Sequence, residues 1–316
     1  MKSITVLRSS LKYFALLVVL SLTLLLSWLR WDSGRPRDNW FSERHGQIET
    51  IAAEASVTRY GQLSETVRLI SDSSLQVSFR VIRDAKSAAR LPVLVILGGH
   101  RTGSNAVELF GDVGNHAIVG MDYPYAGPDK VRGVISVART IPMARQAVLD
   151  TVPAVSLLLD WLVEQDWVDK KRIIIIGASL GAPFAAATAA RDERITGLML
   201  VHGAADNRLW LEAQVARQID ARLLHYPLAS VLYWLAYGPV FDTEKQIAMI
   251  SPRPVLIVGA RDDERTPAGQ AELLFDAAGN PRRLRWTEGQ HIQPDRQDIV
   301  AALLRITDEE IAFLTQ

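Results

Sequence analysis

The 316-residue sequence contains no cysteine. Disulfide bonds, thiolate nucleophiles and cysteine-based zinc or iron–sulfur sites are therefore excluded. This absence does not decide the compartment, because a chain without thiols suits oxidising and reducing environments alike. The sequence also lacks a His-Glu-x-x-His pattern, a Walker phosphate loop and a Gly-x-Gly-x-x-Gly dinucleotide motif. We therefore expect chemistry that needs neither a metal nor another cofactor.

A net charge is lacking as well, since Lys plus Arg and Asp plus Glu both number 35. Nucleic-acid binding requires a basic surface, so no nucleic-acid partner is expected. The densest basic stretch, Arg282, Arg283 and Arg285, is predicted to lie on a solvent-facing strand. The hydrophobic content of 48% is typical of a globular protein, and the length suffices for a large core.

An apolar run from Tyr13 to Leu29 follows three basic residues and is closed by Arg30. Its length is at the short end for a transmembrane helix. No Ala-x-Ala site follows the run, and Trp28 and Trp31 suit a membrane interface. We predict an uncleaved membrane anchor, and the alternative is a cleaved signal peptide followed by secretion. Basic residues slightly favour a cytoplasmic N-terminal tip and an extracytoplasmic domain, periplasmic or lumenal.

The rest of the chain alternates between strand and helix patterns. Residues 1–38 are predicted to form the tip, the anchor and linker sequence, with polar, linker-like composition continuing to residue 50. Residues 39–316 form one folded domain. Strands that alternate with helices predict an α/β fold with a mostly parallel central sheet flanked by helices. The predicted strands are Thr66–Ile70, Gln76–Ile82, Pro92–Leu97, Ala117–Met121, Arg172–Ile176, Ile195–Val201, Pro254–Val258 and Arg283–Trp286.

Two long segments between these strands are predicted to be helical. Residues 134–164 have helical periodicity, in which Pro142 and Pro153 mark the starts or kinks of separate segments. Residues 204–248 contain no predicted strand and are rich in Trp, Tyr and Leu. We interpret 204–248 as a helical insertion between two strands.

The strongest chemical signal is Gly177-Ala178-Ser179-Leu180-Gly181, directly after a run of isoleucines and before an alanine-rich helix. A serine on a tight strand-to-helix turn needs small neighbours, and the turn exposes its hydroxyl above the sheet. The following helix N-terminus favours developing negative charge. The alternative is a glycine-rich turn with a serine N-cap. We predict that Ser179 is a nucleophile.

A general base for Ser179 should follow the last strand, if the chain order is Ser, Asp, His. Among six histidines, only His291 has this position. The acid should follow the preceding strand, where Asp262, Asp263 and Glu264 are consecutive. We favour Asp263, four residues before Pro267, and keep Asp262 as the alternative acid.

Together these motifs resemble the α/β-hydrolase superfamily over about residues 60–316. The acid follows the serine by 84 residues (263−179), and the histidine follows the acid by 28 (291−263). Asp263-Glu264-Arg265-Thr266-Pro267 and Gly289-Gln290-His291 look like the loops of esterases near the dienelactone-hydrolase branch. The serine nucleophile counts against dienelactone hydrolysis itself. The resemblance implies that 204–248 is a lid, and that the backbone amides of Leu180 and His100 form the oxyanion hole, with Arg101 as the alternative to His100.

The function expected from these residues is that of a serine hydrolase that cleaves a carboxylic ester through an acyl-enzyme intermediate. The substrate is expected to be a small-molecule or lipid-like ester. An acyltransferase or a peptidase with the same residues stays open, because the fold does not choose the acceptor. A non-catalytic binding protein on the same fold is the other alternative.

Overall fold

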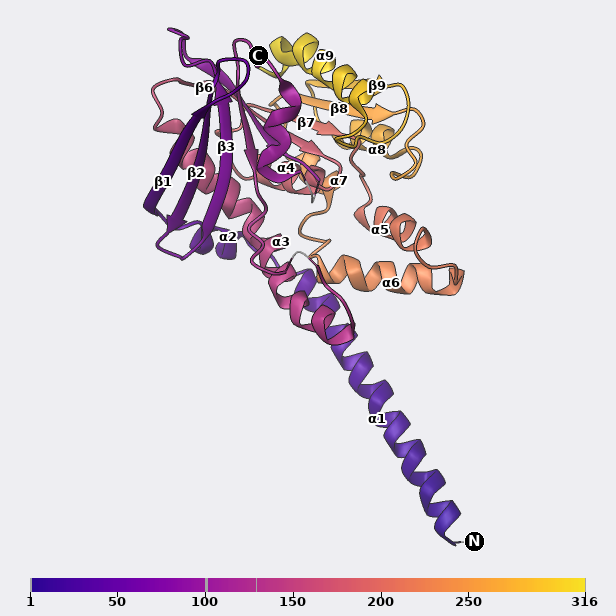
Figure 1. The fold of residues 1–316 in the computed structure, drawn as a ribbon. Coiled ribbons are helices and arrows are strands. Elements are labelled where there is room, and N and C mark those ends of the chain that lie inside the picture. Colours follow the sequence, from indigo (N-terminus) through magenta and orange to yellow (C-terminus); the bar gives the residue numbers. More distant parts are fainter. Residues whose placement is uncertain (1, 100–101, 129, 316) are drawn as a thin grey trace.

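A mostly parallel β-sheet forms the centre of the protein (Figure 1). The structure is a computed structural model and describes residues 2–99, 102–128 and 130–315. In this part of the chain the strand order is β1-β2-β3-β5-β4-β6-β7-β8-β9. Strands β4 to β9 run parallel, whereas β1, β2 and β3 pair antiparallel with their neighbours. The strands are β1 (Ile48–Val57), β2 (Leu63–Ser71), β3 (Gln76–Arg83), β4 (Leu91–Leu97), β5 (Ala117–Met121), β6 (Val168–Ala178), β7 (Gly197–Val201), β8 (Val255–Ala260) and β9 (Arg282–Thr287).

The side chains of the central strands alternate between two cores, one on each face of the sheet. On β6, Ile173 and Ile175 join the core covered by α3, α4 and α8, while Ile174 and Ile176 join the core covered by η1 and α9. All four isoleucines are buried, as expected for a parallel strand covered on both faces. The covering elements are α3 (Val134–Val163), α4 (Gly181–Ala189), α8 (Gln270–Ala277), η1 (Gly103–Phe110) and α9 (Gln297–Leu314).

The α/β fold and its parallel sheet are confirmed, but the predicted linker was wrong in its second half. Residues 38–45 form helix α2 (Asp38–His45), and β1 begins at Ile48. Helix α2 buries Phe41 against α3, and β1 is an edge strand that is exposed on both faces. An edge strand with no buried face has no apolar alternation, so its sequence resembles a linker. Helix α3 is also continuous, with Pro142 and Pro153 inside it rather than between separate segments.

Three helices connect β7 to β8 in the region where the sequence predicted an insertion. They are α5 (Asn207–Ala216), α6 (Arg222–Leu235) and α7 (Thr243–Ala248). Helices α5 and α6 pack against each other and lie to one side of the sheet (Figure 1). This side is near the carboxyl ends of the parallel strands, where open α/β sheets bind ligands.

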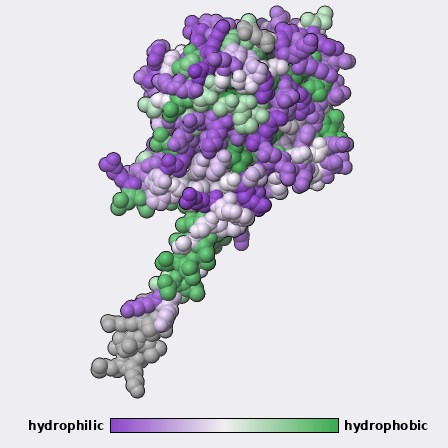
Figure 2. Space-filling model, turned by 180° about the vertical axis from the view of Figure 1, so that it is seen from behind, coloured by the Kyte–Doolittle hydropathy of each residue, from purple (hydrophilic) through white to green (hydrophobic). Residues whose placement is uncertain are grey.

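Helix α1 (Lys2–Ser33) projects from the body of the protein as a long rod (Figures 1 and 2). Among the described residues, two helical segments are long and apolar enough to span a membrane, Lys12–Ser33 and Ile135–Val163. The second is mostly buried inside the protein, as a core helix is, whereas the first is mostly exposed. Figure 2 shows the first as an apolar rod below a largely hydrophilic body.

The base of α1 is fixed to the body by charged groups. Asp32 forms ion pairs with Arg37 and with Arg145 of α3, both at 2.7 Å. The Arg145 guanidinium also donates to the backbone carbonyls of Trp234 and Leu235 at the end of α6. One arginine therefore ties α1, α3 and α6 together.

Candidate active site

Ser179 lies on the tight turn between β6 and α4 with a φ of 54°. Its backbone N–H donates to the carbonyl of Val201. Glycine is required at positions 177 and 181, two residues before and after the serine, because neither position has room for a Cβ atom. A Cβ at 181 would come within 1.9 Å of the Leu97 carbonyl oxygen, and one at 177 within 2.6 Å of the Ala185 Cβ. A positive φ on a non-glycine residue stores strain, which is characteristic of functional sites.

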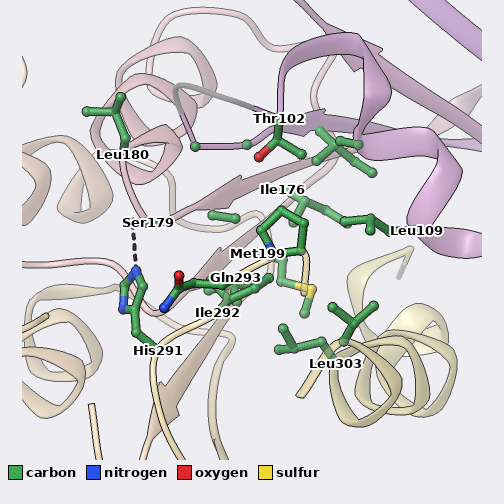
Figure 3. Close-up of a pocket in the computed structure, with 18 of the residues that line it drawn as sticks. Thr102, Leu109, Ile176, Ser179, Leu180, Met199, His291, Ile292, Gln293 and Leu303 are labelled. Carbon is green, nitrogen blue, oxygen red and sulfur yellow. Dashed lines mark hydrogen bonds between the residues drawn. The ribbon is translucent and has the colours of Figure 1, made fainter. Parts of the chain in front are cut away.

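His291 bridges Ser179 and Asp263. Its Nε2 lies 2.7 Å from the Ser179 Oγ (Figure 3). Its Nδ1 lies 3.0 and 2.9 Å from the two carboxylate oxygens of Asp263. An ionised carboxylate only accepts hydrogen bonds, so the proton is on Nδ1. The Nε2 lone pair therefore faces the serine hydroxyl. His291 as a whole is 1% exposed.

Asp263 and Asp262 have different surroundings. The Oδ1 of Asp263 accepts hydrogen bonds from the backbone N–H groups of Arg265 and Thr266. Burial alone would raise the pKa of the Asp263 carboxyl, but the hydrogen bond and charge of His291 and these two N–H groups lower it below its usual value. Asp262 is exposed, and its backbone N–H donates to Gly289. The structure brings Asp263 to His291 and leaves Asp262 in solvent.

The backbone of His291 is held by side chains on both of its polar groups. Glu264 accepts the His291 N–H at 2.9 Å, and Arg296 donates to the His291 carbonyl at 2.5 Å. Glu264 and Arg296 also form an ion pair with each other. Burial would raise the pKa of Glu264, but its bonds to the His291 backbone and to Arg296 lower it. Glu264 therefore helps to hold the histidine loop in place.

His202 is a residue of this site that the sequence analysis missed. It directly follows β7, is 2% exposed, and its ring lies 5.6 Å from the His291 ring. Its Nδ1 accepts the backbone N–H of Ile292 at 2.9 Å, and its Nε2 is 2.9 Å from the Thr287 hydroxyl. Because Nδ1 accepts, the proton is on Nε2 and the ring is neutral. Burial and, to a smaller extent, the nearby His291 together lower the pKa of His202 to about 4, and the charges of Asp263 and Glu264 oppose this shift only in part. In the sequence, the one feature that could have identified His202 as a site residue is its position directly after a predicted parallel strand.

His202, Asp263 and His291 are close enough together to suggest a metal site, with ligand atoms within 4.8 Å of one another. All four ring nitrogens of the two histidines already have hydrogen-bond partners within the protein. A metal ion would have to replace those bonds. The donor set therefore fits a hydrogen-bonded relay better than a metal centre.

Of the groups predicted for the oxyanion hole, the structure describes Leu180, which directly follows Ser179. Leu180 is at the N-terminus of α4, where backbone N–H groups and the helix dipole favour negative charge. His100 and Arg101 lie outside the described residues. At the start of their loop, the hydroxyl of the partly buried Tyr123 donates to the Gly98 carbonyl at 2.7 Å, and desolvation raises the pKa of this tyrosine. Tyr123 thus fixes the loop where it leaves β4.

Two cavities meet at Ser179. The larger, of about 600 Å³, extends toward α9, while a smaller one of about 110 Å³ lies toward α5 and α6. Ser179, Leu180 and Trp210 line both cavities. The serine hydroxyl is therefore placed where the two arms of a bound molecule would join.

A model of the prolyl oligopeptidase family matches residues 148–295, which include Ser179, Asp263 and His291. No match was found among curated proteins. The structure is similar to that of acetyl xylan esterase from Paenibacillus sp. R4, with 17% identity and a TM-score of 0.57 over 82% of this chain and 89% of that chain. The chain has the α/β-hydrolase fold.

Two further structures with this fold are similar over most of their length. Acetyl xylan esterase 1 from Thermoanaerobacterium sp. JW/SL YS485 has 14% identity and a TM-score of 0.57 over 88% of this chain and 96% of that one. Glucuronoyl esterase from Solibacter usitatus has 16% identity and a TM-score of 0.52 over 86% and 91%. In α/β hydrolases the turn after this strand carries the nucleophile, and the acid and histidine follow in that order. Ser179, Asp263 and His291 follow one another in the same chain order.

Proposed function

We propose that this protein is a serine hydrolase that cleaves carboxylic esters, with Ser179 as nucleophile, His291 as general base and Asp263 as the acid that orients it. The observation that carries the proposal is the hydrogen-bonded series from the Ser179 Oγ through His291 to Asp263. A nucleophile bonded to a base, which is in turn bonded to an orienting group, is the arrangement that acyl transfer requires.

In the first half of the reaction, Ser179 attacks the ester carbonyl while His291 Nε2 takes its proton. The resulting imidazolium is stabilised by Asp263, whose carboxylate stays ionised because its pKa is low. The imidazolium then donates the proton to the departing alcohol, leaving an acyl-enzyme. In the second half, His291 activates water, which attacks the acyl-enzyme and releases the acid.

The negative charge that develops on the carbonyl oxygen would be received by the backbone N–H of Leu180. Removing one such donor typically costs ~3–4 kcal/mol of transition-state stabilisation. The second donor, predicted at His100, belongs to the same proposal. Tyr123 supports it by holding the Gly98 carbonyl at the beginning of that loop.

Esters are the proposed substrates because the structural neighbours described above are named as esterases, including the acetyl xylan and glucuronoyl esterases. A peptidase is the second candidate, because the matched family model is that of prolyl oligopeptidases. Esters are favoured by the apolar lining of both cavities, which offers few partners for a peptide backbone.

The proposal extends to the parts around the site. Helices α5 to α7 act as the lid, since Trp210 of α5 and Tyr233 of α6 line the cavities beside Ser179.

Helix α1 acts as an uncleaved membrane anchor, with the catalytic domain on the extracytoplasmic side. The alternative is a signal peptide whose removal releases a secreted domain. The mostly exposed apolar surface of α1 supports the anchor.

Hydrolysis of p-nitrophenyl acetate and butyrate by the full chain in detergent tests the activity. We expect Ser179→Ala to lose essentially all turnover, whereas Ser156→Ala on α3 serves as a control with unchanged rates. Proline p-nitroanilides test the peptidase alternative. Equal activity of wild type and Ser179→Ala would refute the proposed nucleophile.

A further inference from the structure

We infer that the substrate carries one long, unbranched aliphatic chain, and that this chain lies in the larger cavity between the sheet and α9. The inference rests on the proposed ester hydrolysis at Ser179 and adds the class of ester. The cavity begins at Ser179 and His291, and its volume of about 600 Å³ is that of a site for a sizeable organic ligand. We infer the class of ligand from the course of this cavity along the strands and from the residues that line it.

The floor of the cavity is formed by the parallel sheet. Ile96, Ile176 and Met199 are direct neighbours across β4, β6 and β7, and all three line the cavity. Ala178 and Val201 form the next row of this face, nearer to the serine. The space therefore runs from the carboxyl edge backward along the strands. From Ser179 to Ile176 it extends along three residues of β6, roughly 10 Å.

The opposite wall is helical and just as apolar. Helix α9 contributes Val300, Leu303, Leu304 and Thr307, which span roughly 10 Å along the helix axis. Leu109 and Phe110 of η1 close another side. In Figure 3, Ile176, Met199, Leu109 and Leu303 surround a space on the side of Ser179 opposite to Leu180. The result is a largely apolar space between the sheet and α9.

Polar groups occur at the Ser179 end of this space. Gln214, Arg265 and Gln293 lie near the catalytic residues. Deeper in the cavity, the hydroxyl of Thr307 is already used, because it donates to the Leu303 carbonyl at 2.9 Å and lies 3.7 Å from the Met199 sulfur. A sugar or peptide would leave its polar groups without partners there, at a large cost. A hydrocarbon chain has no such groups.

The test is the dependence of kcat/KM on chain length. Two series are measured with the full chain in detergent, p-nitrophenyl esters from acetate to dodecanoate and alkyl acetates from methyl to dodecyl, because either arm of the ester could enter the cavity. We expect one series to rise by roughly threefold to fourfold per methylene up to medium chain lengths. If acetates and butyrates are hydrolysed but neither series rises, the inference is wrong while the proposed function stands. If no ester is hydrolysed, the proposed function fails.

A matched pair of variants locates the chain. Leu303 lines the cavity, whereas Ile306, on the same helix and equally buried, does not. We expect Leu303→Phe to lower the ratio of dodecanoyl to acetyl (or dodecyl to methyl) turnover at least tenfold, and Ile306→Phe to leave the ratio unchanged. Titration of dodecanoate and of dodecanol into Ser179→Ala tests the cavity without turnover. Absence of binding of both, or equal ratios in the two variants, would overturn the inference.

A separate observation concerns the outer surface near α1. Helix α6 exposes Leu223 to 92% and also Leu224 and Tyr226, and the first turns of α3 expose Ile135 to 71% and also Val137. Helix α6 contacts α1, and α3 is bound to α1 through Arg145 and Asp32. In Figure 1, α6 and the start of α3 lie at the end of the body from which α1 projects.

We propose that this face, defined by Leu223, Leu224, Tyr226, Ile135 and Val137, rests on the lipid bilayer that α1 enters. Large apolar side chains at such exposure are costly in water and are typical of interfacial membrane contacts. The continuity with the exposed apolar surface of α1 identifies lipid as the occupant. Since α6 also lines the smaller cavity, the active site would open close to the membrane surface.

The absence of cysteine makes this proposal easy to test. Single-cysteine variants Leu223→Cys and Ile135→Cys of the full chain are labelled with bimane and reconstituted into vesicles that contain nitroxide-labelled phosphatidylcholine. Leu273→Cys on α8 is the exposed control. We expect at least twofold stronger quenching at 223 and 135 than at 273. Equal quenching at all three sites would overturn the proposal, and so would burial of the label by a second copy of the chain without quenching.

Discussion

The Nδ1 of His202 accepts the backbone N–H of Ile292 at 2.9 Å, so a buried histidine holds the residue next to His291. We expect His202→Phe to lower kcat roughly 10²-fold, because displacing a catalytic group by about 1 Å costs that much. KM should change little. His202→Gln, which retains an acceptor, should recover part of the loss. Steady-state kinetics of the wild type and both variants, measured across pH, tests this positioning role. If His202 only stabilised the fold, glutamine would not restore kcat.

The low pKa of His202 predicts how stability depends on pH. A histidine with a pKa of about 4 in the folded state and 6.5 in the unfolded state binds protons preferentially when unfolded. Its contribution is complete above pH 6.5, declines as the pH falls below that value, and is lost below about pH 4. The total is of order ~3 kcal/mol. Denaturant unfolding of wild type and His202→Phe between pH 7.5 and 4.5 should show a steeper loss for wild type. Parallel curves would contradict the assignment.

Asp263 and Asp262 provide a neighbouring pair with opposite expectations. Asp263→Asn should reduce kcat by about 10⁴-fold, because an amide no longer selects the Nδ1–H form of His291. Asp262→Asn should stay within twofold of wild type, since its side chain is in solvent. The comparison is made by kcat on p-nitrophenyl butyrate. A larger effect at 262 than at 263 would reverse the assignment of the acid.

The turn at Ser179 predicts that residue 181 tolerates no side chain. In Gly181→Ala, the new Cβ would lie 1.9 Å from the Leu97 carbonyl oxygen, so β4 and the loop after it must shift. We expect a loss of roughly 2–4 kcal/mol in the free energy of unfolding and the loss of most activity. Gly34→Ala, where the nearest atoms are 3.8 Å away, is the control and should be close to neutral. Wild-type stability and activity in Gly181→Ala would mean that the turn is not as tight as described.

Much of the fold was predictable because its central strands are buried on both faces. Ala117–Met121 was predicted with its observed limits, and the isoleucines of β6 identified the strand that leads to Ser179. Strand β1 and helix α2 were not recognised. One is exposed on both faces, and the other is a short polar helix whose Phe41 is buried only by its contact with distant residues. Such elements depend on tertiary packing rather than on local pattern.

Some residues of the site were likewise predictable from the sequence, whereas others depend on tertiary contacts. Ser179 and His291 stand out because a strand-to-turn pattern gives each a position at the sheet edge. The choice between Asp262 and Asp263 requires the conformation of the loop, which the backbone bonds to Arg265 and Thr266 determine. His202 has no motif of its own, since its role comes from a contact with Ile292, 90 residues away.

The most direct test of the central claim is peptide mass spectrometry of the full chain after inactivation by a fluorophosphonate. We predict one adduct, on Ser179, formed in proportion to the loss of esterase activity and absent from His291→Ala. An adduct on another serine, or undiminished ester hydrolysis by a protein fully labelled at Ser179, would contradict the account.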